Sequence, residues 1–509
     1  LVPVSIILVL QKMSIYQSVL LPDGNTYSLP TGLFINNEWK TSDKTFEVID
    51  PSTEKVLTHV YEAGVKEVDE AVNAAKKVMK TWKDVPGEEK AKKMLKLAEL
   101  LKQNIEMFSV VEAADSGKPL ETNAKEDMKS VVDYLIYCAG FADKLHGTTI
   151  PIAKNRYAIT KRYPLVVGQI IPWNYPLSMA SWKFCPALAC GCTMVLKSSE
   201  LTPLSLLLFA DLVKEAGFPP GVFNVVSGFG AIAGERIANH PDLDKVAFTG
   251  STLTGQKIMR NAASNLKMVS LECGGKSPLL VFDDANLEQA AKWASFGMMY
   301  NSGQNCTANS RILVQDKVYD KFINLYVKAV KEDWTVGSPF DNKANLGPVI
   351  SKKQYDKIKS YIQKGKDEGA VLILGEDSDQ LRSLPKDGYY IPPTIFKNCT
   401  QDMTIVREEI FGPVVAISKF TTDEEAVEKA NDSEYGLAAM VFSENFGRIQ
   451  TVADQLEAGS VYLNASNDED TRVPFGGYKM SGIGRELGEA AIELYTQTKS
   501  FYMNVSHRL

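Results

Sequence analysis

The chain has 509 residues, which is too long for one hydrophobic core, so we expect two or three domains. Its hydrophobic fraction of 45% and charged fraction of 23% exclude an intrinsically disordered protein. The formal net charge of -6, with no dense Lys/Arg run interleaved with aromatic residues, argues against nucleic acid as a partner.

The first ten residues form an apolar run that resembles the core of a signal peptide. This run is shorter than the roughly 20 apolar residues that cross a bilayer, and no positive charge precedes it, so we expect no membrane association. Because the sequence starts with Leu1, Met13 is a candidate for the native start. We assign residues 1–30 to an N-terminal extension.

Seven cysteines, an odd and scattered set, fit a reducing compartment. The first arginine is Arg156, which excludes an Arg-rich mitochondrial presequence. We therefore expect free thiols and a cytoplasmic location. The segment "CPALACGC" holds Cys185, Cys190 and Cys192 but no fourth ligand at matched spacing, so we expect core packing there and no metal.

Apolar residues at three- and four-residue steps predict an amphipathic helix over residues 65–82, and further helical patterns occupy 88–115 and about 124–145. From residue 165, short β-branched runs alternate with helix-length segments, which predicts βαβ units and a parallel sheet. These runs cover residues 165–171, 193–196, 222–226, 245–248 and 268–271. A second α/β region follows from about 276, with strand-like runs at "SRILVQ", "GAVLILG", "YYIPPTIF", "GPVVAISKF", "LAAMVFS" and "SVYLN".

A polar motif follows each strand of the first region. In order these are "PWN" at 172–174, "KSSE" at 197–200, "SGFG" at 227–230, "TGS" at 249–251 and "ECGG" at 272–275. In open α/β sheets, ligands bind at the carboxyl ends of strands, where loops and helix N-termini face one crevice. We therefore expect the five motifs to converge on one cleft.

Two glycine motifs favour a nucleotide in that cleft. "GFGAIAG" at 228–234, which contains Gly230, is one residue longer than the dinucleotide fingerprint, and a plain glycine turn is the alternative. "FTGSTLTG" at 248–255 offers Gly250 and Ser251 at the start of a helix, where backbone N–H groups can hold a pyrophosphate. Glu200 could accept hydrogen bonds from two ribose hydroxyls, with Lys197 nearby, and would select NAD over NADP; a solvated surface pair is the alternative.

Cys306, in "NSGQNCTANSR", lies among small polar residues, unlike a buried structural cysteine. A Cys-His hydrolase would need an imidazole base, but none of the four histidines lies in a loop that looks paired with this thiol. Glu272, in "LECGG" at the last strand end of the first region, is the better candidate for a base. Because the two residues belong to different regions, we expect an interdomain site.

With these motifs together, the sequence resembles the aldehyde dehydrogenase superfamily from about "GLFINNEW" to "YTQTKS". "PWNYP", "FTGST", "LECGGKSP", "GQNC", "EEIFGPV" and "PFGGYKMSGIGRE" occur in the family's order. Among its branches, the chain most resembles the fungal cytosolic, NAD-linked enzymes. The resemblance implies an α/β fold with two doubly wound domains, a Rossmann-variant cofactor domain and a catalytic domain, plus a small oligomerisation β-hairpin.

The resemblance also implies domain bounds and partners. The NAD-binding domain would cover residues 31–146 and 168–275, and the catalytic domain 276–489. Residues 147–167 and 490–509 would form the oligomerisation segment of a homodimer or homotetramer.

The family mechanism carries over residue by residue. Cys306 as thiolate would attack the aldehyde, with the oxyanion held by the Asn174 amide and the Cys306 backbone N–H. Hydride would pass to NAD, and Glu272 would activate water to hydrolyse the thioester to a carboxylic acid. The expected cofactor contacts are Trp173, Lys197, Glu200, Gly230, Gly250, Ser251, Glu409 and Phe411.

One segment departs from many branches of the family. Residues 467–470, "NDED", are acidic where fatty and aromatic aldehyde branches present aromatic side chains. Charge complementarity would favour a cationic aldehyde such as an ω-aminoaldehyde, and a solvated loop is the alternative. Tyr175, Trp182 and Phe475 would supply apolar walls for small aliphatic aldehydes.

Transfer to coenzyme A and a non-catalytic binding role are disfavoured because Glu272 and the other site residues are present.

Overall fold

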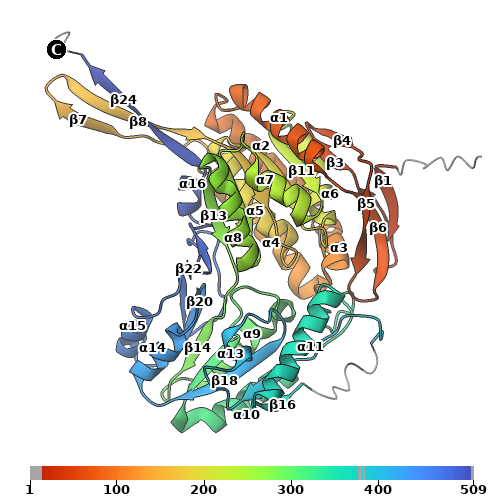
Figure 1. Ribbon diagram of the computed structural model, residues 1–509, viewed down its shortest axis with the longest axis vertical. Coiled ribbons are helices and arrows are strands. Elements are labelled where there is room, and N and C mark those ends of the chain that lie inside the picture. Colours follow the sequence, from red (N-terminus) through yellow and green to blue (C-terminus); the bar gives the residue numbers. More distant parts are fainter. Residues whose placement is uncertain (1–13, 376–380, 382–383, 506–509) are drawn as a thin grey trace, which may run out of the picture.

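The computed structural model describes residues 14–375, 381 and 384–505. The apolar run over residues 1–10 and Met13 lie outside these residues. Two large β-sheets flanked by helices form the body of the molecule, and a three-stranded arm projects from it (Figure 1). None of the helices in the described ranges is both long and apolar enough to cross a membrane.

The first sheet has eight strands, and its five central ones are parallel, as the βαβ pattern predicts. In spatial order the strands are β23 (Gly482–Ile483), β13 (Met268–Glu272), β12 (Lys245–Thr249), β9 (Val166–Ile170), β10 (Thr193–Ser198), β11 (Phe223–Ser227), β3 (Leu33–Ile35) and β4 (Glu38–Lys40). The five strand-like runs of the sequence are these five central strands. The edge strand β23 comes from a distant part of the chain and runs antiparallel to β13.

Helices cover both faces of this sheet because alternate strand residues point to opposite sides. Val166 and Val195 pack into one buried cluster with helix α1 (Val65–Trp82), whereas Val167 and Leu196 pack into the other. The second cluster includes α2 (Gly87–Gln103), α3 (Ile105–Ser116), α4 (Lys125–Ala139), α5 (Pro176–Cys190) and α6 (Leu204–Glu215). The helical pattern at 88–115 is thus two helices, which meet at Asn104, whose φ of -115° is non-helical.

The second sheet has seven strands in the order β16 (Val371–Leu374), β17 (Thr394–Lys397), β18 (Val414–Phe420), β15 (Arg311–Gln315), β14 (Pro278–Val281), β20 (Ala438–Phe442) and β21 (Ser460–Leu463). The six strand-like runs of the second region are six of these strands. The strand without an expectation is the buried β14. The helices of this second region are α9 (Leu287–Met299), α10 (Tyr319–Asp333), α11 (Lys352–Asp367), α13 (Thr404–Arg407), α14 (Asp423–Asn431) and α15 (Phe446–Ala453).

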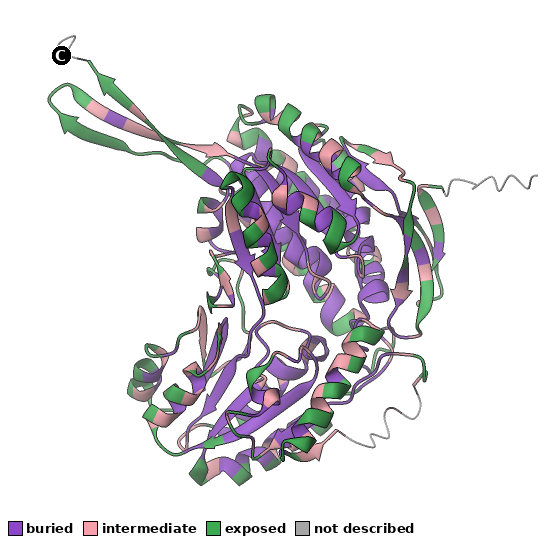
Figure 2. Cartoon of the chain, in the orientation of Figure 1, coloured by how far each residue is buried: buried purple, intermediate pink, exposed green. Residues whose placement is uncertain are grey.

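The remaining elements are short or peripheral. The arm consists of β7 (Thr149–Ala153), β8 (Arg156–Pro164) and β24 (Thr496–Asn504), and Figure 2 shows it largely exposed while the two sheets are buried. Two hairpins, β1 (Tyr16–Leu20) with β2 (Thr26–Pro30) and β5 (Thr45–Asp50) with β6 (Lys55–Tyr61), pack beside the first sheet. The others are α7 (Glu235–Asn239), α8 (Thr252–Ala262), β19 (Tyr435–Gly436), β22 (Tyr478–Lys479) and α16 (Ala490–Glu493). The domain bounds stay a prediction.

Candidate active site

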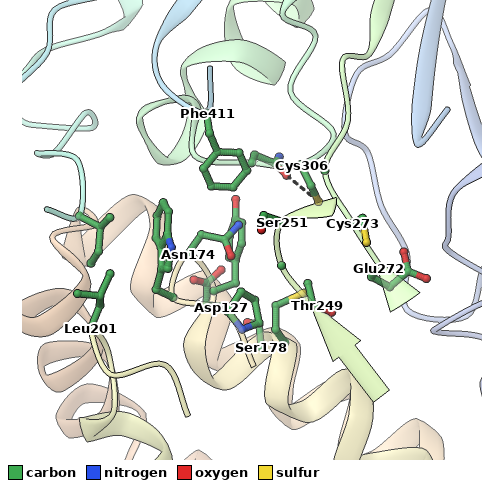
Figure 3. Close-up of a pocket in the computed structure, with 18 of the residues that line it drawn as sticks. Asp127, Asn174, Ser178, Leu201, Thr249, Ser251, Glu272, Cys273, Cys306 and Phe411 are labelled. Atoms are coloured by element: carbon green, nitrogen blue, oxygen red, sulfur yellow. Dashed lines mark hydrogen bonds between the residues drawn. The ribbon is translucent and has the colours of Figure 1, made fainter. Parts of the chain in front are cut away.

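One large pocket, with a volume of about 1120 Å³, brings together the strand ends of the first sheet and loops of the second (Figure 3). Of the residues expected at the site, all but Lys197 and Gly230 line it. Those that line it are Trp173, Asn174, Glu200, Gly250, Ser251, Glu272, Cys306, Glu409 and Phe411. The expected single cleft between two regions is therefore present.

Cys306 follows a tight loop at the end of α9. Asn301 and Ser302 in this loop adopt left-handed backbone conformations, with φ of 52° and 56°, which is uncommon for residues other than glycine. At Gly303 a Cβ would lie 2.3 Å from the Gly412 carbonyl oxygen, so only glycine lets the loop approach so closely. Cys306 is half-buried, whereas the other six cysteines of the chain are buried.

Asn174 links the first sheet to this loop. Its Nδ2 donates a 3.0 Å hydrogen bond to the Gln304 carbonyl, and Asn301 Nδ2 donates a 3.1 Å hydrogen bond to the Asn174 carbonyl. An amide nitrogen has two N–H donors, and this bond uses one of them. The second donor is therefore available to an oxygen bound near Cys306.

Glu272 ends strand β13 with its carboxyl group buried. Among the described residues, no hydrogen-bond partner reaches either of its oxygens. Burial, followed by the charge of Glu486, raises the pKa of Glu272 well above its usual range, although Lys183 and Arg485 oppose the rise. A Cβ at Gly476 would lie 2.9 Å from Glu272 Oε1. In Figure 3 the carboxyl group is turned away from the space between Asn174 and Cys306.

The thiol of Cys306 lies in a negative environment. Burial and then the charges of Glu469, Glu409 and Glu272 raise its pKa well above the usual range. At neutral pH the protonated thiol is therefore the dominant form in the free protein. Positive charge brought into the pocket would favour the thiolate.

Lys197 and Glu200 lie together at the end of β10. Lys197 is buried, and its Nζ donates a 2.9 Å hydrogen bond to the Ser198 carbonyl and lies 3.4 Å from Glu200 Oε2. Burial lowers the pKa of Lys197. This geometry differs from a solvated surface pair, because the lysine stands behind the carboxylate and Glu200 faces the pocket.

Gly250 and Ser251 connect β12 to α8 at the pocket wall. A Cβ at Gly250 would lie 2.6 Å from Phe248 Cζ, so this turn requires glycine. Ser251 caps α8 by accepting a hydrogen bond from the Thr254 N–H. The remaining N–H groups of the first turn can bind an anion.

Gly230, like Lys197, is an expected cofactor contact that does not line the pocket. It is exposed, and no heavy atom lies within 4 Å of a Cβ built on it. A Cβ built on Gly234, four residues further along the chain, would lie 3.7 Å from Lys197 Cδ. A cofactor role for Gly230 stays a prediction.

Glu409 and Phe411 come from the second half of the chain. Glu409 Oε1 accepts a 2.9 Å hydrogen bond from the Gly275 N–H, which ties it to the first sheet. The Phe411 ring meets the Trp173 ring edge to face, with centroids 5.3 Å apart (Figure 3 shows Phe411 above the pocket). Phe411 has a φ of 61°, a rare value for a bulky residue.

Sequence reasoning missed several residues of the wall. Asp127 and Glu126 belong to a charged helix whose pattern looks like any solvated face, so no signal distinguished them. Of the acidic segment 467–470, only Asn467 and Glu469 line the pocket. In the described part of the chain, no group of three or more His, Cys, Asp or Glu side chains is arranged to hold a metal ion.

Comparison with known proteins gives the same assignment over nearly the full length. A model of the aldehyde dehydrogenase family matches residues 39–501. An aldehyde dehydrogenase-like protein of Schizosaccharomyces pombe is 55% identical over 97% of this chain and 99% of its own. "Aldehyde dehydrogenase [NAD(P)+] 1" of Saccharomyces cerevisiae is 47% identical over 94% of this chain and 96% of its own.

Solved structures agree with the fold. The NAD+ complex of an aldehyde dehydrogenase from Bacillus cereus has a TM-score of 0.91 and 46% identity, covering 94% of this chain and 97% of that one. A betaine aldehyde dehydrogenase from Staphylococcus aureus in complex with NAD+ has a TM-score of 0.91 and 40% identity, covering 94% and 96%. The family resemblance and the α/β fold class are confirmed. The chain belongs to the aldehyde dehydrogenase family and is an oxidoreductase that acts on aldehydes.

Proposed function

We propose that the protein oxidises an aldehyde to the carboxylic acid through a covalent bond to Cys306, with NAD as the cofactor. The observation that carries this proposal is the single pocket lined by the Cys306 thiol, the Asn174 amide and the Glu272 carboxyl group. An accessible thiol beside an amide donor and an unpaired carboxyl group has the parts needed for covalent catalysis on a carbonyl.

The pocket also suits a dinucleotide. Its volume of about 1120 Å³ exceeds that of common small-ligand sites, which leaves room for a cofactor and an aldehyde together. Glu200 would accept hydrogen bonds from ribose hydroxyls, the Gly250–Ser251 turn would hold the pyrophosphate, and Glu409 with Phe411 would hold the second ribose. The negative Glu200 favours NAD over NADP. The yeast relative is named for both cofactors, so we test this preference below.

The first step joins the thiol to the substrate. Cys306 releases its proton to water in the pocket and its sulfur attacks the carbonyl carbon, which places a negative charge on the former carbonyl oxygen until that oxygen takes up a proton from water. The second N–H of the Asn174 amide and the Cys306 backbone N–H would stabilise this oxyanion. The product of the step is a thiohemiacetal on Cys306.

The second step frees the acid. NAD held by Glu200, the Gly250–Ser251 turn, Glu409 and Phe411 would supply a hydride acceptor, and the thiohemiacetal would lose a hydride from carbon and a proton from its hydroxyl to leave a thioester on Cys306. Glu272 then removes a proton from water, which attacks the thioester and releases the carboxylic acid and the Cys306 thiol. For this, the Glu272 side chain has to turn from the position in Figure 3 toward the sulfur. Glu272 favours hydrolysis over transfer to coenzyme A.

Two substrate classes fit the walls. Tyr175, Trp182 and Phe475 line the pocket with aromatic surface that suits small aliphatic aldehydes. Glu469 in the same pocket suits an aldehyde with a positive charge, such as an aminoaldehyde. The betaine aldehyde dehydrogenase among the structural relatives is named for a cationic aldehyde, which supports the second class.

Assembly and location complete the proposal. The exposed arm of β7, β8 and β24 would pair with another copy of the chain in a homodimer or homotetramer. Residues 147–167 and 490–509 would supply this contact, with 31–146 and 168–275 as the cofactor domain and 276–489 as the catalytic domain. The free cysteines support a cytoplasmic location.

The test is turnover of propanal by the purified protein with NAD, followed as reduced cofactor and as propanoic acid. We expect Cys306→Ser to lower kcat by about 10³-fold or more, because a hydroxyl is a far weaker nucleophile. Cys399→Ser, outside the pocket lining, should retain activity. Full activity of Cys306→Ser would overturn the proposal.

A further inference from the structure

Asn305 is the residue before the proposed nucleophile, and it lines the same pocket. Its Oδ1 accepts a 3.8 Å hydrogen bond from the Cys306 thiol, and Figure 3 marks a hydrogen bond of Cys306 with a dashed line. The thiol is the donor in this bond, so the bond exists only while the sulfur carries its proton.

Two donors of Thr307 fix the Asn305 oxygen in this place. The Thr307 N–H donates a 3.3 Å hydrogen bond to Oδ1, and the Thr307 hydroxyl donates one of 3.0 Å. A backbone N–H can only donate, so the atom that faces it is the amide oxygen and not the amide nitrogen. Thr307 is buried, which keeps water away from these bonds. Turning the amide over would break both of them.

The chain on the other side of Asn305 is held as well. The Gln304 carbonyl accepts a 3.0 Å hydrogen bond from the Asn174 amide and a 3.3 Å bond from the Asn301 amide. The Gln304 side-chain oxygen accepts a 2.9 Å hydrogen bond from the Ile350 N–H. Asn305 therefore stands in a fixed loop, and the contact of its oxygen with the thiol is part of that loop's structure.

An amide oxygen in this position favours the thiol over the thiolate. When the proton leaves, the hydrogen bond is lost and the partial negative charge of the oxygen faces a negative sulfur. Three carboxylates act on Cys306 in the same direction, namely Glu469, Glu409 and Glu272. Two tyrosines also interact with charge on the thiol, Tyr175 and Tyr462, and their raised pKa values keep them neutral at ordinary pH.

We propose that Asn305 is a positioning residue that holds Cys306 in its protonated, unreactive form until a substrate enters the pocket. This inference rests on the proposed function and names what restrains its nucleophile in the free protein. The thiolate is the form that reacts with oxidants and alkylating agents, so the bond to Asn305 protects the sulfur between turnovers. The sulfur leaves this bond when it attacks the carbonyl carbon.

The test measures the Cys306 thiolate by its ultraviolet absorbance, from neutral to alkaline pH. The signal of each protein is the difference from the same protein carrying Cys306→Ser. Asn305→Leu keeps the approximate shape and removes the acceptor, so we expect about threefold more thiolate at the same pH, as for one lost hydrogen bond. Asn305→Asp keeps an acceptor and adds a negative charge, so the thiolate fraction should fall.

Opposite shifts separate this role from a loosened loop, which would expose the sulfur in both variants. Asn324→Leu, the same substitution at an exposed position of α10, should leave the thiolate fraction unchanged. The proposal is wrong if Asn305→Leu leaves the thiolate fraction unchanged or lowers it, or if Asn305→Asp does not lower it. Should Asn305→Leu not fold, Asn305→Asp decides by the same criterion.

Hydrogen peroxide tests the protective effect. The thiolate attacks one peroxide oxygen, the O–O bond breaks, and the products are the sulfenic acid of Cys306 and hydroxide. Mass spectrometry should find this product about threefold faster in Asn305→Leu than in the unmodified protein, more slowly in Asn305→Asp and equally fast in Asn324→Leu. Equal rates in all four proteins would rule out protection by Asn305. Neither measurement needs turnover, so an active Cys306→Ser would refute the proposed function and leave these results interpretable.

Discussion

Lys197 Nζ lies 3.4 Å from Glu200 Oε2, with the lysine buried under the sheet edge and the carboxylate facing the pocket. Because the Lys197 amine is also bonded to the Ser198 carbonyl, its position is fixed from two sides. The pair therefore orients a negative charge toward the space where an adenosine ribose would lie.

This orientation predicts the cofactor preference. In Glu200→Gln the negative charge is lost while the shape is kept, so repulsion of a 2′-phosphate falls. We expect the ratio of kcat/KM for NADP to that for NAD to rise about tenfold, measured with one aldehyde at saturation. Glu215→Gln, on the exposed end of α6, should leave the ratio unchanged. An unchanged ratio in Glu200→Gln would remove Glu200 from cofactor selection.

The parts of the site that sequence could predict are those that follow strands. Parallel strands carry their carboxyl ends to one edge, so "PWN", "KSSE", "TGS" and "ECGG" could be placed together before any coordinates. The same logic put "SGFG" at this edge, yet Gly230 lies outside the pocket, because the chain needs only a few residues to turn away after β11.

Other features had no local signal. The edge strand β23 has two residues, and its pairing with β13 depends on long-range geometry that no periodicity encodes. In the sequence, the pocket-lining residue Asp127 has the pattern of a solvated helix residue. Only the packing of α4 against neighbouring elements brings it to the pocket. Glu469 was visible only as part of an acidic segment, and its separation from Asp470 depends on the direction of each side chain.

Lys118 is held in a buried ion pair behind the pocket wall. Its Nζ lies 2.5 Å from Asp127 Oδ2 and 4.5 Å from the centre of the Tyr175 ring. We expect Lys118→Met to lower the free energy of unfolding by about 3–5 kcal/mol, because it leaves Asp127 buried without a partner. Denaturant titration measures this. Lys129→Met, which breaks an exposed pair with Glu126, should cost less than about 1 kcal/mol. Equal losses in the two variants would contradict the buried pair's role.

Lys276 presents the opposite case, a buried lysine with no hydrogen-bond partner for Nζ among the described residues. Burial, with Arg311 nearby, lowers its pKa to about 7. The unfolded chain therefore binds one more proton than the folded protein between about pH 7 and pH 10.5, and stability rises with pH across this window. Below it, the folded protein carries the full cost of a buried charge.

Lys276→Met removes that cost. We expect the variant to have a higher Tm than the unmodified protein at about pH 6, with the difference shrinking toward about pH 9.5, as measured by thermal unfolding. Lys183→Met is the matched control, because Lys183 is buried but donates hydrogen bonds to Thr249 and Glu486. That control should lower Tm. A Tm difference for Lys276→Met that stays constant or grows with pH would contradict the assigned titration.

Glu272→Gln separates the two halves of the proposed reaction. The substitution keeps the side-chain shape but removes the base that activates water, so the thioester on Cys306 should form and then persist. In a stopped-flow experiment with NAD and propanal, we expect a rapid phase that forms one equivalent of reduced cofactor per site. The steady-state rate that follows should be at least about 10²-fold lower than that of the unmodified protein. Mass spectrometry should find the propanoyl group on Cys306.

Glu444→Gln, an exposed residue outside the pocket lining, should show normal turnover in the same experiment. Two results would contradict the role of Glu272. A normal steady-state rate would mean that water is activated by another group, with Glu469 in the same pocket as a candidate. Loss of the rapid phase would mean that Glu272 acts before the thioester forms, by removing the proton from Cys306. The size and rate of the first phase thus decide which step the buried carboxylate serves.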